Sequence, residues 1–309
     1  MNDRLSIVIS VYNEEKNIRA LMEELMSVIP IITSDYEVIF VDDGSTDSSF
    51  GIISSSMCEN KRVKVIRFTR NFGQHAAMMA GFSCASGDII VTMDADLQND
   101  PRDISALLAK LEEGYDVVGG LRKDRKDPFF RRMASLLVNR LISRLTGVRL
   151  NDHGCMLRAY RKSVIEKLGR LKETPLYPVA LISWLGVSVA EVPVNHRERH
   201  SGRSKYDFPK LVNTTYKLFI AFSSFPGLSV ILAGLTIVLF SLIFGLYLAY
   251  DLIANGVRPG FIEMMAFILF LGQGLIFSVI GYLGDFIGRI YAETLGRPHY
   301  IIRDTLGFD

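Results

Sequence analysis

The stretch VTMDADLQND, residues 91–100, decides how this chain folds, because it marks the place where a buried strand meets its ligand-binding edge. Apolar and small residues run directly into Asp94 and Asp96, and Asp100 follows just before Pro101. Carboxylates so close together repel one another, and the end of a buried strand stabilises their charges poorly. The two aspartates therefore need a compensating partner.

The chain before about residue 200 alternates short apolar runs with amphipathic stretches. Runs rich in Val and Ile predict strands, which we place at 5–12, 36–43, 63–70, 88–96 and 115–122. Helices are expected between them, at 14–29, 45–56, 75–83 and 103–113, with Asp47 as a candidate cap of the second and Asp100 or Asp103 of the fourth. This alternation predicts an α/β fold with a mostly parallel sheet that is covered on both faces.

Polar residues follow the predicted strands at their carboxyl ends, where open α/β sheets bind ligands. They are Tyr12, Asn13, Asp42, Asp43, Asp94, Asp96 and Arg122. Two carboxylates at alternating positions of a strand end can share one Mg²⁺, which prefers a few carboxylate oxygens together with phosphate oxygens of a substrate. A lone D-x-D occurs by chance in many chains, so the acids at the earlier strand ends strengthen the interpretation. The sequence predicts a metal site for a phosphorylated substrate.

Local charge says more than the net charge of +2. The segment from Arg122 to Arg170 holds fourteen Lys and Arg against four Asp and Glu, which favours an anionic substrate or an anionic membrane surface. A solvated basic face is the alternative. The cysteines Cys58, Cys84 and Cys155 are odd in number and lack metal-ligand spacing, as is typical of a reducing cytosol.

The chain changes character after about residue 217. Residues 218–250 and 264–284 carry no charge, and a membrane-crossing helix needs roughly 20 apolar residues. We predict two membrane spans, at 228–250 and 264–283; two buried core helices are the alternative. Basic residues flank the pair at Arg203, Lys205, Lys210, Lys217, Arg289, Arg297 and Arg303, whereas the intervening loop has only Arg258. This asymmetry predicts cytoplasmic termini and a cytoplasmic α/β domain.

Two further segments have the pattern of interfacial helices. Residues 128–147 place apolar side chains at helical spacing with arginines among and beside them, which is typical of a helix on an anionic membrane surface. An ordinary helix packed on the sheet is the alternative. Residues 206–227 lead into the first span, and we expect a juxtamembrane helix there that is broken before Pro226.

Several motifs together resemble the polyprenyl-phosphate type of family 2 glycosyltransferases, which have the Rossmann-like GT-A fold. The resemblance rests on SIVISVYNEEKNI (6–18), VDDGSTDSS (41–49), TRNFGQHAAMMAG (69–81), MDADLQNDP (93–101), DHGCMLRAYRK (152–162), SGRSKY (201–206) and GRIYAETLGRPHY (288–300). It covers essentially the whole chain and is nearest to bacterial undecaprenyl-phosphate sugar transferases. Members that transfer different sugars share much of the pattern, so the sequence does not name the sugar.

The resemblance implies roles for particular residues. Tyr12 and Glu14 would lie near the nucleotide and Asp42 on its base, with Asp43 beside it. Asp94, Asp96 and Gln98 would bind Mg²⁺ or Mn²⁺. Basic residues are candidates for the pyrophosphate and the acceptor phosphate, because arginine binds phosphate in a bidentate way; they are Arg122, Arg131, Arg140, Arg203 and Lys205. Structural alternatives stay open: Tyr12 covers the sheet edge, or Asp42 and Asp43 cap the helix after Gly44.

One position departs from the family pattern. Several relatives carry an aspartate, assigned as the base, where this chain has Cys155, and Asp152 is the carboxylate that is available nearby. A phosphate monoester has its second pKa near 6, so the acceptor is already largely anionic at pH 7 and a strong base is optional. Asp152 therefore acts either as a catalytic residue or by positioning His153 or an arginine.

The combined interpretation is a membrane-anchored, inverting glycosyltransferase. It would move a sugar from a UDP-sugar to undecaprenyl or another polyprenyl phosphate at the cytoplasmic leaflet of the bacterial inner membrane, with membrane lipid but no nucleic acid as a further partner. We also expect a homo-oligomer, with a tetramer as the guess. The expected parts are a catalytic domain (1–205), interfacial helices (206–227), a membrane hairpin (228–284) and a cytoplasmic tail (285–309).

Two rival hypotheses remain. A processive polysaccharide synthase is disfavoured, because the chain has no Q-x-x-R-W motif and two spans are too few for a sugar-chain channel. A non-catalytic scaffold, or a partner of a lipid-sugar flippase, would bind a nucleotide sugar without turning it over. Metal-dependent turnover separates that hypothesis from an enzyme.

Overall fold

The structure is a computed structural model that describes residues 3–122, 152, 154–169, 185–197, 228–296 and 298–308. The chain forms two compact units. The first consists of Met1–Leu211 together with Pro298–Asp309, and the second of Val212–Arg297. The last residues of the chain thus belong to the same unit as the first ones.

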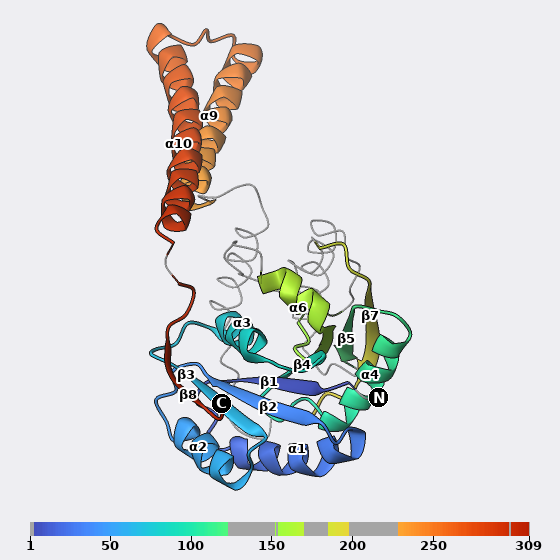
Figure 1. Ribbon diagram of the computed structural model, residues 1–309. Coiled ribbons are helices and arrows are strands. Elements are labelled where there is room, and N and C mark those ends of the chain that lie inside the picture. Colours follow the sequence, from blue (N-terminus) through green and yellow to red (C-terminus); the bar gives the residue numbers. More distant parts are fainter. Residues whose placement is uncertain are drawn as a thin grey trace. The chain divides into compact units, whose positions relative to one another are not determined.

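The first unit is built on a sheet whose strands follow the order β7-β5-β6-β4-β1-β2-β3-β8 (Figure 1). The strands are β1 (Leu5–Val11), β2 (Tyr36–Asp42), β3 (Val63–Phe68), β4 (Ile89–Asp94), β5 (Val117–Arg122), β6 (Arg158–Arg161), β7 (Val189–Val194) and β8 (Ile302–Leu306). Parallel pairs join β1 to β2 and β4, β2 to β3, and β5 to β7, whereas β6 and β8 run antiparallel to their neighbours. This confirms the predicted, mostly parallel α/β sheet.

Helices cover both faces of the sheet, so its central strands are buried on both sides. On one face α1 (Ile18–Ile32), α2 (Ser49–Glu59) and α4 (Ile104–Glu112) pack their apolar side chains into one core cluster. On the other face α3 (Gln74–Cys84) and α6 (Lys162–Gly169) form a second cluster. A short 3₁₀ turn, η1 (Pro101–Asp103), precedes α4, and Asp100 caps it by accepting a hydrogen bond from the Arg102 N–H at 3.0 Å.

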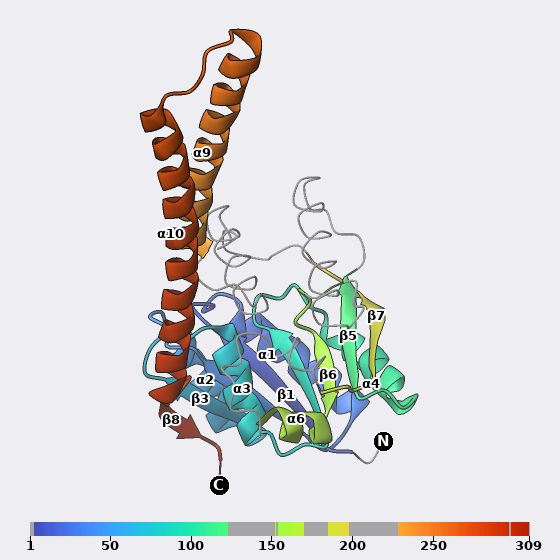
Figure 2. The same ribbon diagram turned by 90° about the horizontal axis from the view of Figure 1, so that it is seen from above.

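Three elements differ from the sequence-based expectation. Helix α2 begins at Ser49 and not at residue 45; Asp47 lies just before its N-cap residue, Ser48, and accepts a hydrogen bond from the Ser49 N–H at 3.0 Å. Helix α1 begins at Ile18 and not at Glu14, because residues 13–15 form a turn that hydrogen-bonds to the loop after β2. The segment predicted as a separate tail from residue 285 also divides differently. Its first part continues α10 (Phe261–Thr294), and its last part forms β8 at the edge of the sheet beside β3 (Figure 2).

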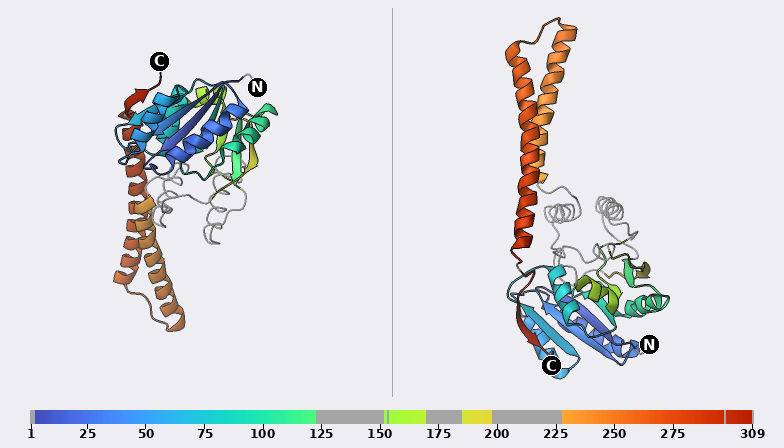
Figure 3. Two further views of the ribbon diagram at one scale, coloured as in Figure 1. Left: turned by 90° about the horizontal axis from the view of Figure 1, so that it is seen from below. Right: turned by 45° about the horizontal axis from the view of Figure 1, so that its top comes forward.

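The second unit contains two long apolar helices that lie side by side, α9 (Leu228–Ala254) and α10 (Figure 3). Both are long and apolar enough to cross a membrane. They approach closely at Gly234 and Gly274, where a Cβ on Gly274 would lie 2.9 Å from the Gly234 carbonyl oxygen. The Ser241 hydroxyl also donates to the Phe267 carbonyl at 3.0 Å. Small residues and such hydrogen bonds are the usual means of packing helices in lipid, where no hydrophobic force favours their association.

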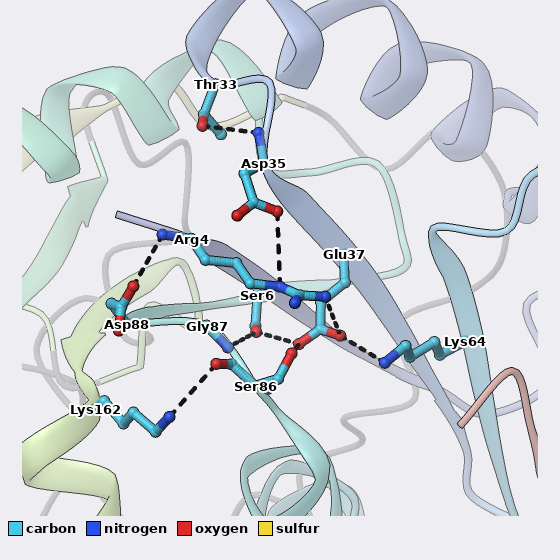
Figure 4. A network of polar contacts seen from close by, with 10 residues as sticks. All are labelled: Arg4, Ser6, Thr33, Asp35, Glu37, Lys64, Ser86, Gly87, Asp88 and Lys162. Carbon is cyan, nitrogen blue, oxygen red and sulfur yellow. Dashed lines mark hydrogen bonds and ion pairs between the residues drawn. The ribbon is translucent and has the colours of Figure 1, made fainter. Parts of the chain in front are cut away.

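A buried carboxylate, Glu37 on β2, joins β1, β3 and the loop before β4 at the amino edge of the sheet (Figure 4). Its Oε1 accepts hydrogen bonds from the Ser6 hydroxyl at 2.5 Å and from the Ser86 N–H at 2.7 Å. Its Oε2 lies 2.9 Å from the Lys64 ammonium and 3.6 Å from the Arg4 guanidinium. Burial by itself would raise the pKa of Glu37, but the hydrogen bonds from Ser6, Lys64 and Ser86 outweigh it and lower the pKa to about 2.

Replacing Glu37 by glutamine should destabilise the protein by about 2–3 kcal/mol at pH 7. Because the pKa of Glu37 is lowered from 4.5 to about 2, its charge stabilises the fold above about pH 4.5, and this contribution is lost as the pH falls towards 2. We expect the gap in thermal unfolding temperature between the wild-type protein and Glu37→Gln, measured in detergent by circular dichroism, to narrow in acid.

The matched control is Asp35→Asn, since Asp35 is 65% exposed and lies 3.8 Å from the same Arg4 guanidinium. It should change stability by less than about 0.5 kcal/mol. Equal stability of Glu37→Gln and the wild-type protein at pH 7 would contradict the role given to this network.

Candidate functional site

The carboxyl ends of the central strands meet at one edge of the sheet. The register pairs Val11 with Asp42, and Ser10 with Asp94. Asp42 is in turn opposite Arg67, the next-to-last residue of β3. The structure thus brings together the acids that the sequence placed at successive strand ends.

The turn after β1 and the loop after β2 hold one another in place. Asn13 has a positive φ of 54°, a conformation that asparagine tolerates better than most residues. Its N–H donates to the Ser45 hydroxyl at 3.0 Å, and its side-chain oxygen accepts from the Thr46 N–H at 2.8 Å. The Glu14 N–H donates to the Ser49 hydroxyl at 2.9 Å. These bonds fix the backbone beside Tyr12, whose side chain is 37% exposed at this edge.

Asp42 and Asp43 are both buried, yet they bind different partners. Asp42 accepts a hydrogen bond from the Ser45 N–H at 3.1 Å and lies 3.5 Å from the Arg67 guanidinium. Burial raises its pKa, and the hydrogen bonds with Ser45 and the charge of Arg67 counteract part of that rise. The Asp42 carboxylate is therefore hydrogen-bonded to the loop after β2 and ion-paired with Arg67 on the neighbouring strand β3.

Asp43 does not cap the helix after Gly44, which was one structural alternative. Its two oxygens accept from the backbone N–H groups of Phe72 and Gly73, at 2.7 and 2.9 Å, and so fix the turn before α3. Burial raises its pKa to about 6 despite these bonds. Gly44 is required here, because its φ is +67° and a Cβ would collide with the backbone of Arg70. The loops after β2 and β3 thus pack backbone against backbone.

The aspartate pair that opened the sequence analysis lies where β4 ends. Asp94 accepts a hydrogen bond from the Gln74 side chain at the start of α3, at 2.5 Å. Asp96 is 7% exposed and accepts from the Gln98 N–H at 3.1 Å. Leu97, directly after Asp96, has a positive φ of 63°, which is rare for a residue of this kind and is typical of strained functional turns.

The aspartate turn, residues 94–98, and Asp100 just after it are also held by contacts from His196 and Arg197, which no sequence motif predicted. The Arg197 guanidinium binds both oxygens of Glu24 on α1, at 2.7 and 2.9 Å, and Asp100 at 2.6 Å. The Arg197 N–H donates to the Gln98 carbonyl at 2.9 Å, and the Gln98 side chain lies 3.4 Å from the His196 ring. Since residues 196 and 98 are far apart in sequence and share no motif, only the fold reveals this contact.

Arg122 and Asp152 form a bidentate ion pair at the end of β5. The Arg122 Nε and Nη2 atoms lie 2.7 and 2.8 Å from the two carboxylate oxygens, and Asp152 is only 2% exposed. The Asp152 N–H in turn donates to Glu191 at 2.9 Å. This geometry favours the alternative in which Asp152 positions an arginine over the one in which it accepts a proton.

Cys155 is buried near this ion pair, with only 1% of its surface exposed. Burial and the nearby charge of Asp152 raise the pKa of its thiol to about 11, so the sulfur is protonated at neutral pH. A protonated thiol is a poor nucleophile. The cysteine therefore fills space beside β5 and is not a candidate for covalent chemistry.

Four candidate residues lie outside the described part of the chain: Arg131, Arg140, Arg203 and Lys205. The same holds for the predicted interfacial helices at 128–147 and 206–227. Their assignments stay predictions. Most of the described candidates, by contrast, lie on the strand ends or on the turns that follow them, and Asp152 lies on the segment that precedes β6.

The aspartate turn fits a divalent cation that takes much of its coordination from a substrate. Within the described ranges no cluster of three or more His, Cys, Asp or Glu side chains forms a complete protein-made metal cage. Mg²⁺ and Mn²⁺ favour oxygen ligands, and Mg²⁺ typically uses one or two carboxylates with phosphate oxygens and water. Asp94 and Asp96 supply that kind of donor set.

Residues 6–169 match the family model described as Glycosyl transferase family 2, which is 164 of the 309 residues. The undecaprenyl-phosphate 4-deoxy-4-formamido-L-arabinose transferase of Shewanella sediminis (strain HAW-EB3) is 40% identical over 307 residues, which cover 98% of this chain and 93% of the relative. The chain belongs to glycosyl transferase family 2, and it is a glycosyltransferase.

Solved structures share the fold at low sequence identity. The glucosyl-3-phosphoglycerate synthase of Mycobacterium tuberculosis, in complex with Mn²⁺, uridine diphosphate and phosphoglyceric acid, has a TM-score of 0.53 at 19% identity, over 73% of this chain and 82% of that one. A mannosyltransferase from Pyrobaculum calidifontis, in complex with GDP-Man and Mn²⁺, has a TM-score of 0.50 at 16% identity, over 71% and 70%. The shared architecture is the GT-A fold, and divalent metals are used by proteins that have it.

A double-mutant cycle on Arg122 and Asp152 should show that they act as one unit. We expect Asp152→Asn to lower turnover by about 10- to 100-fold, because it loosens the guanidinium, and Arg122→Ala to lower it at least as much. The double variant should be no slower than Arg122→Ala alone. Turnover is measured with the donor and acceptor proposed below.

The control for this cycle is Asp116→Asn, at the opposite end of β5, where the carboxylate accepts from Ser188 at 2.8 Å. Its turnover should stay within about twofold of wild type, as expected of a surface change far from the chemistry. Losses at Arg122 and Asp152 that multiply in the double variant would instead identify Asp152 as an independent catalytic group.

Proposed function

We propose that this glycosyltransferase moves a sugar from a UDP-sugar to the phosphate of undecaprenol or a related polyprenol, with inversion at the sugar carbon. The product would be a lipid-linked sugar for modification of lipid A, O-antigen or another part of the cell envelope. The observation that carries the proposal is the 40% identity to a transferase of this kind over nearly the whole chain. That similarity extends beyond the sheet domain and includes the two apolar helices.

The donor is assigned to the edge formed by β1, β2 and β4. Tyr12, Glu14, Asp42 and Asp43 would contact the nucleotide, with Asp42 on the base. Asp94, Asp96 and Gln98 would hold Mg²⁺ or Mn²⁺, which when bound neutralises the pyrophosphate and the charge that develops on the departing nucleoside diphosphate. The Gln74 side chain and the Gln98 N–H support this assignment, because they donate to Asp94 and Asp96 respectively and so orient the two carboxylates.

The acceptor chemistry needs orientation more than proton removal. A phosphate monoester is largely dianionic at pH 7, so its oxygen attacks without a strong general base. Arg122 is held rigid by Asp152 and presents a fixed guanidinium to a phosphate group. Arg131, Arg140, Arg203 and Lys205 would complete a basic surface for the pyrophosphate and the lipid phosphate.

The two apolar helices would anchor the enzyme in the bacterial inner membrane with both termini and the catalytic domain in the cytoplasm. The distribution of Lys and Arg in the sequence supports this orientation. An anchored catalytic domain reaches lipid phosphate groups at the inner leaflet, where the acceptor resides. We also propose that the protein works as a homo-oligomer, for which a tetramer is the first state to test.

The decisive experiment incubates the purified full-length protein with undecaprenyl phosphate, Mg²⁺ or Mn²⁺ and a panel of UDP-sugars. UDP-4-deoxy-4-formamido-L-arabinose is the first donor to test, because the 40% identical relative is named for that sugar. The lipid product is identified by mass spectrometry. Transfer from one UDP-sugar supports the proposal, and binding without turnover for every donor supports the scaffold hypothesis instead.

In the same assay Asp96→Asn should reduce transfer by at least about 100-fold while the protein stays folded and membrane-bound. The matched control is Asp88→Asn, at the amino end of the same strand, where the exposed carboxylate accepts from the Arg4 N–H at 3.1 Å. Near-wild-type turnover by Asp96→Asn with either metal would refute the metal assignment.

The loop between the two helices should face the periplasm. A cysteine introduced at Asn255, which is exposed after α9, should react with an impermeant maleimide in intact cells whose outer membrane has been opened. The native Cys58 is exposed in the catalytic domain and serves as the internal control, so it should react only after the inner membrane is permeabilised. Labelling of Cys58 and not of position 255 in intact cells would reverse the proposed orientation.

A further inference from the structure

The last strand of the chain is part of the sheet that carries the donor site, although it follows the second membrane helix in sequence. After α10 ends at Thr294, β8 pairs antiparallel with β3 along Val65–Leu306, Ile66–Thr305 and Arg67–Asp304. The Thr69 N–H extends the contact by donating to the Ile301 carbonyl at 3.0 Å. Without β8, the outer edge of β3 would present its backbone groups to water.

One chain of contacts leads from β8 to Asp42. Arg67 on β3 lies between its register partners Asp304 and Asp42. Its guanidinium is 3.5 Å from the Asp42 carboxylate and lies over the Phe50 ring at 4.0 Å. The ion pair and the ring contact both depend on where β3 places this arginine, and β8 fixes that strand from its outer side.

A second chain of contacts leads to Asp43. The Tyr300 ring, just before β8, stacks on Phe68 with 5.1 Å between centroids. Phe68 contacts Phe72 edge to face at 5.7 Å. Phe72 belongs to the turn whose N–H groups bind the Asp43 carboxylate. Stacked and edge-to-face aromatic pairs of this kind hold their partners in a defined geometry.

We infer that the segment 300–306 is a positioning element of the nucleotide site, and that Tyr300 is its principal positioning residue. It touches neither nucleotide nor sugar; it acts by holding Arg67 and the turn at Phe72–Gly73, and through them Asp42 and Asp43. This inference rests on the proposed function, which places the nucleotide at these two aspartates. Binding of the donor is thereby linked to docking of the chain segment that emerges from the membrane helix.

Variants of Tyr300 test the inference in the full-length, detergent-purified protein with UDP and Mn²⁺, without acceptor. Tyr300→Ala should raise the Kd for UDP by about two- to tenfold, the range expected from the loss of one aromatic pair. Tyr300→Phe keeps the ring and should bind UDP like wild type. The control Arg303→Gln changes a neighbouring side chain that is 59% exposed, and it should also leave the Kd unchanged.

Steady-state kinetics separate positioning from general damage. Tyr300→Ala should raise the KM for the UDP-sugar by a similar factor and leave the KM for undecaprenyl phosphate within about twofold, because only the donor side depends on Tyr300. An unchanged Kd for UDP in a folded Tyr300→Ala protein would overturn the inference. So would equal changes in both KM values.

Hydrogen exchange on the wild-type protein gives a second test that needs no variant. If docking of β8 favours UDP binding, UDP must favour docking of β8 by the same factor. Saturating UDP with Mn²⁺ should therefore slow amide exchange in residues 302–306, relative to Mn²⁺ alone. Wild-type protein that binds UDP without any slowing there overturns this inference alone, whereas wild-type protein that does not bind UDP overturns the proposed function with it.

Discussion

The structure depends on the stabilisation of buried carboxylates at one edge of the sheet. Asp42, Asp43, Asp96 and Asp152 are each less than a tenth exposed, and burial of an ionised carboxylate is unfavourable unless hydrogen bonds or opposite charges compensate it. Each of the four has such partners: backbone N–H groups for all of them, and arginines for Asp42 and Asp152. The turns around the site take the shapes that deliver those partners, which explains the positive φ at Gly44 and Leu97.

The two edges of the same sheet treat their acids differently. At the amino edge, Glu37 has donors on β1, on β3 and in the loop before β4, and its pKa is lowered to about 2, so its charge is well stabilised. At the carboxyl edge, burial raises the pKa of Asp43 to about 6, because two backbone donors only partly offset the loss of water. Glu37 at the amino edge holds the strands together, whereas the buried carboxylates at the carboxyl edge would be stabilised further by a positively charged partner. The amino edge is therefore structural, and the carboxyl edge carries the candidate functional site.

The site is also held from outside the motifs that define it. Arg197 links α1 to the aspartate turn, and β8 links the end of the chain to β3. Both contacts join residues that are far apart in sequence, and both act on the backbone that carries the acids. The chain returns from α10 into the sheet as β8, so the strand that borders β3 is covalently continuous with the apolar helices.

The sequence by itself determined the α/β class, the strands that end in acids, the two apolar helices and the position of Asp94 and Asp96 together at the end of one strand. These features follow from local periodicity and from the spacing of polar residues, which a single chain displays directly. The tertiary structure decided which partner each acid takes: Asp43 binds the turn before α3 and not the helix after Gly44, and Asp152 binds Arg122. It also decided that the last residues form β8 and that Arg197 clamps the aspartate turn. Such contacts depend on strand order and on distances between segments, and these are set by the packing of the whole domain and leave no periodic signal in the sequence.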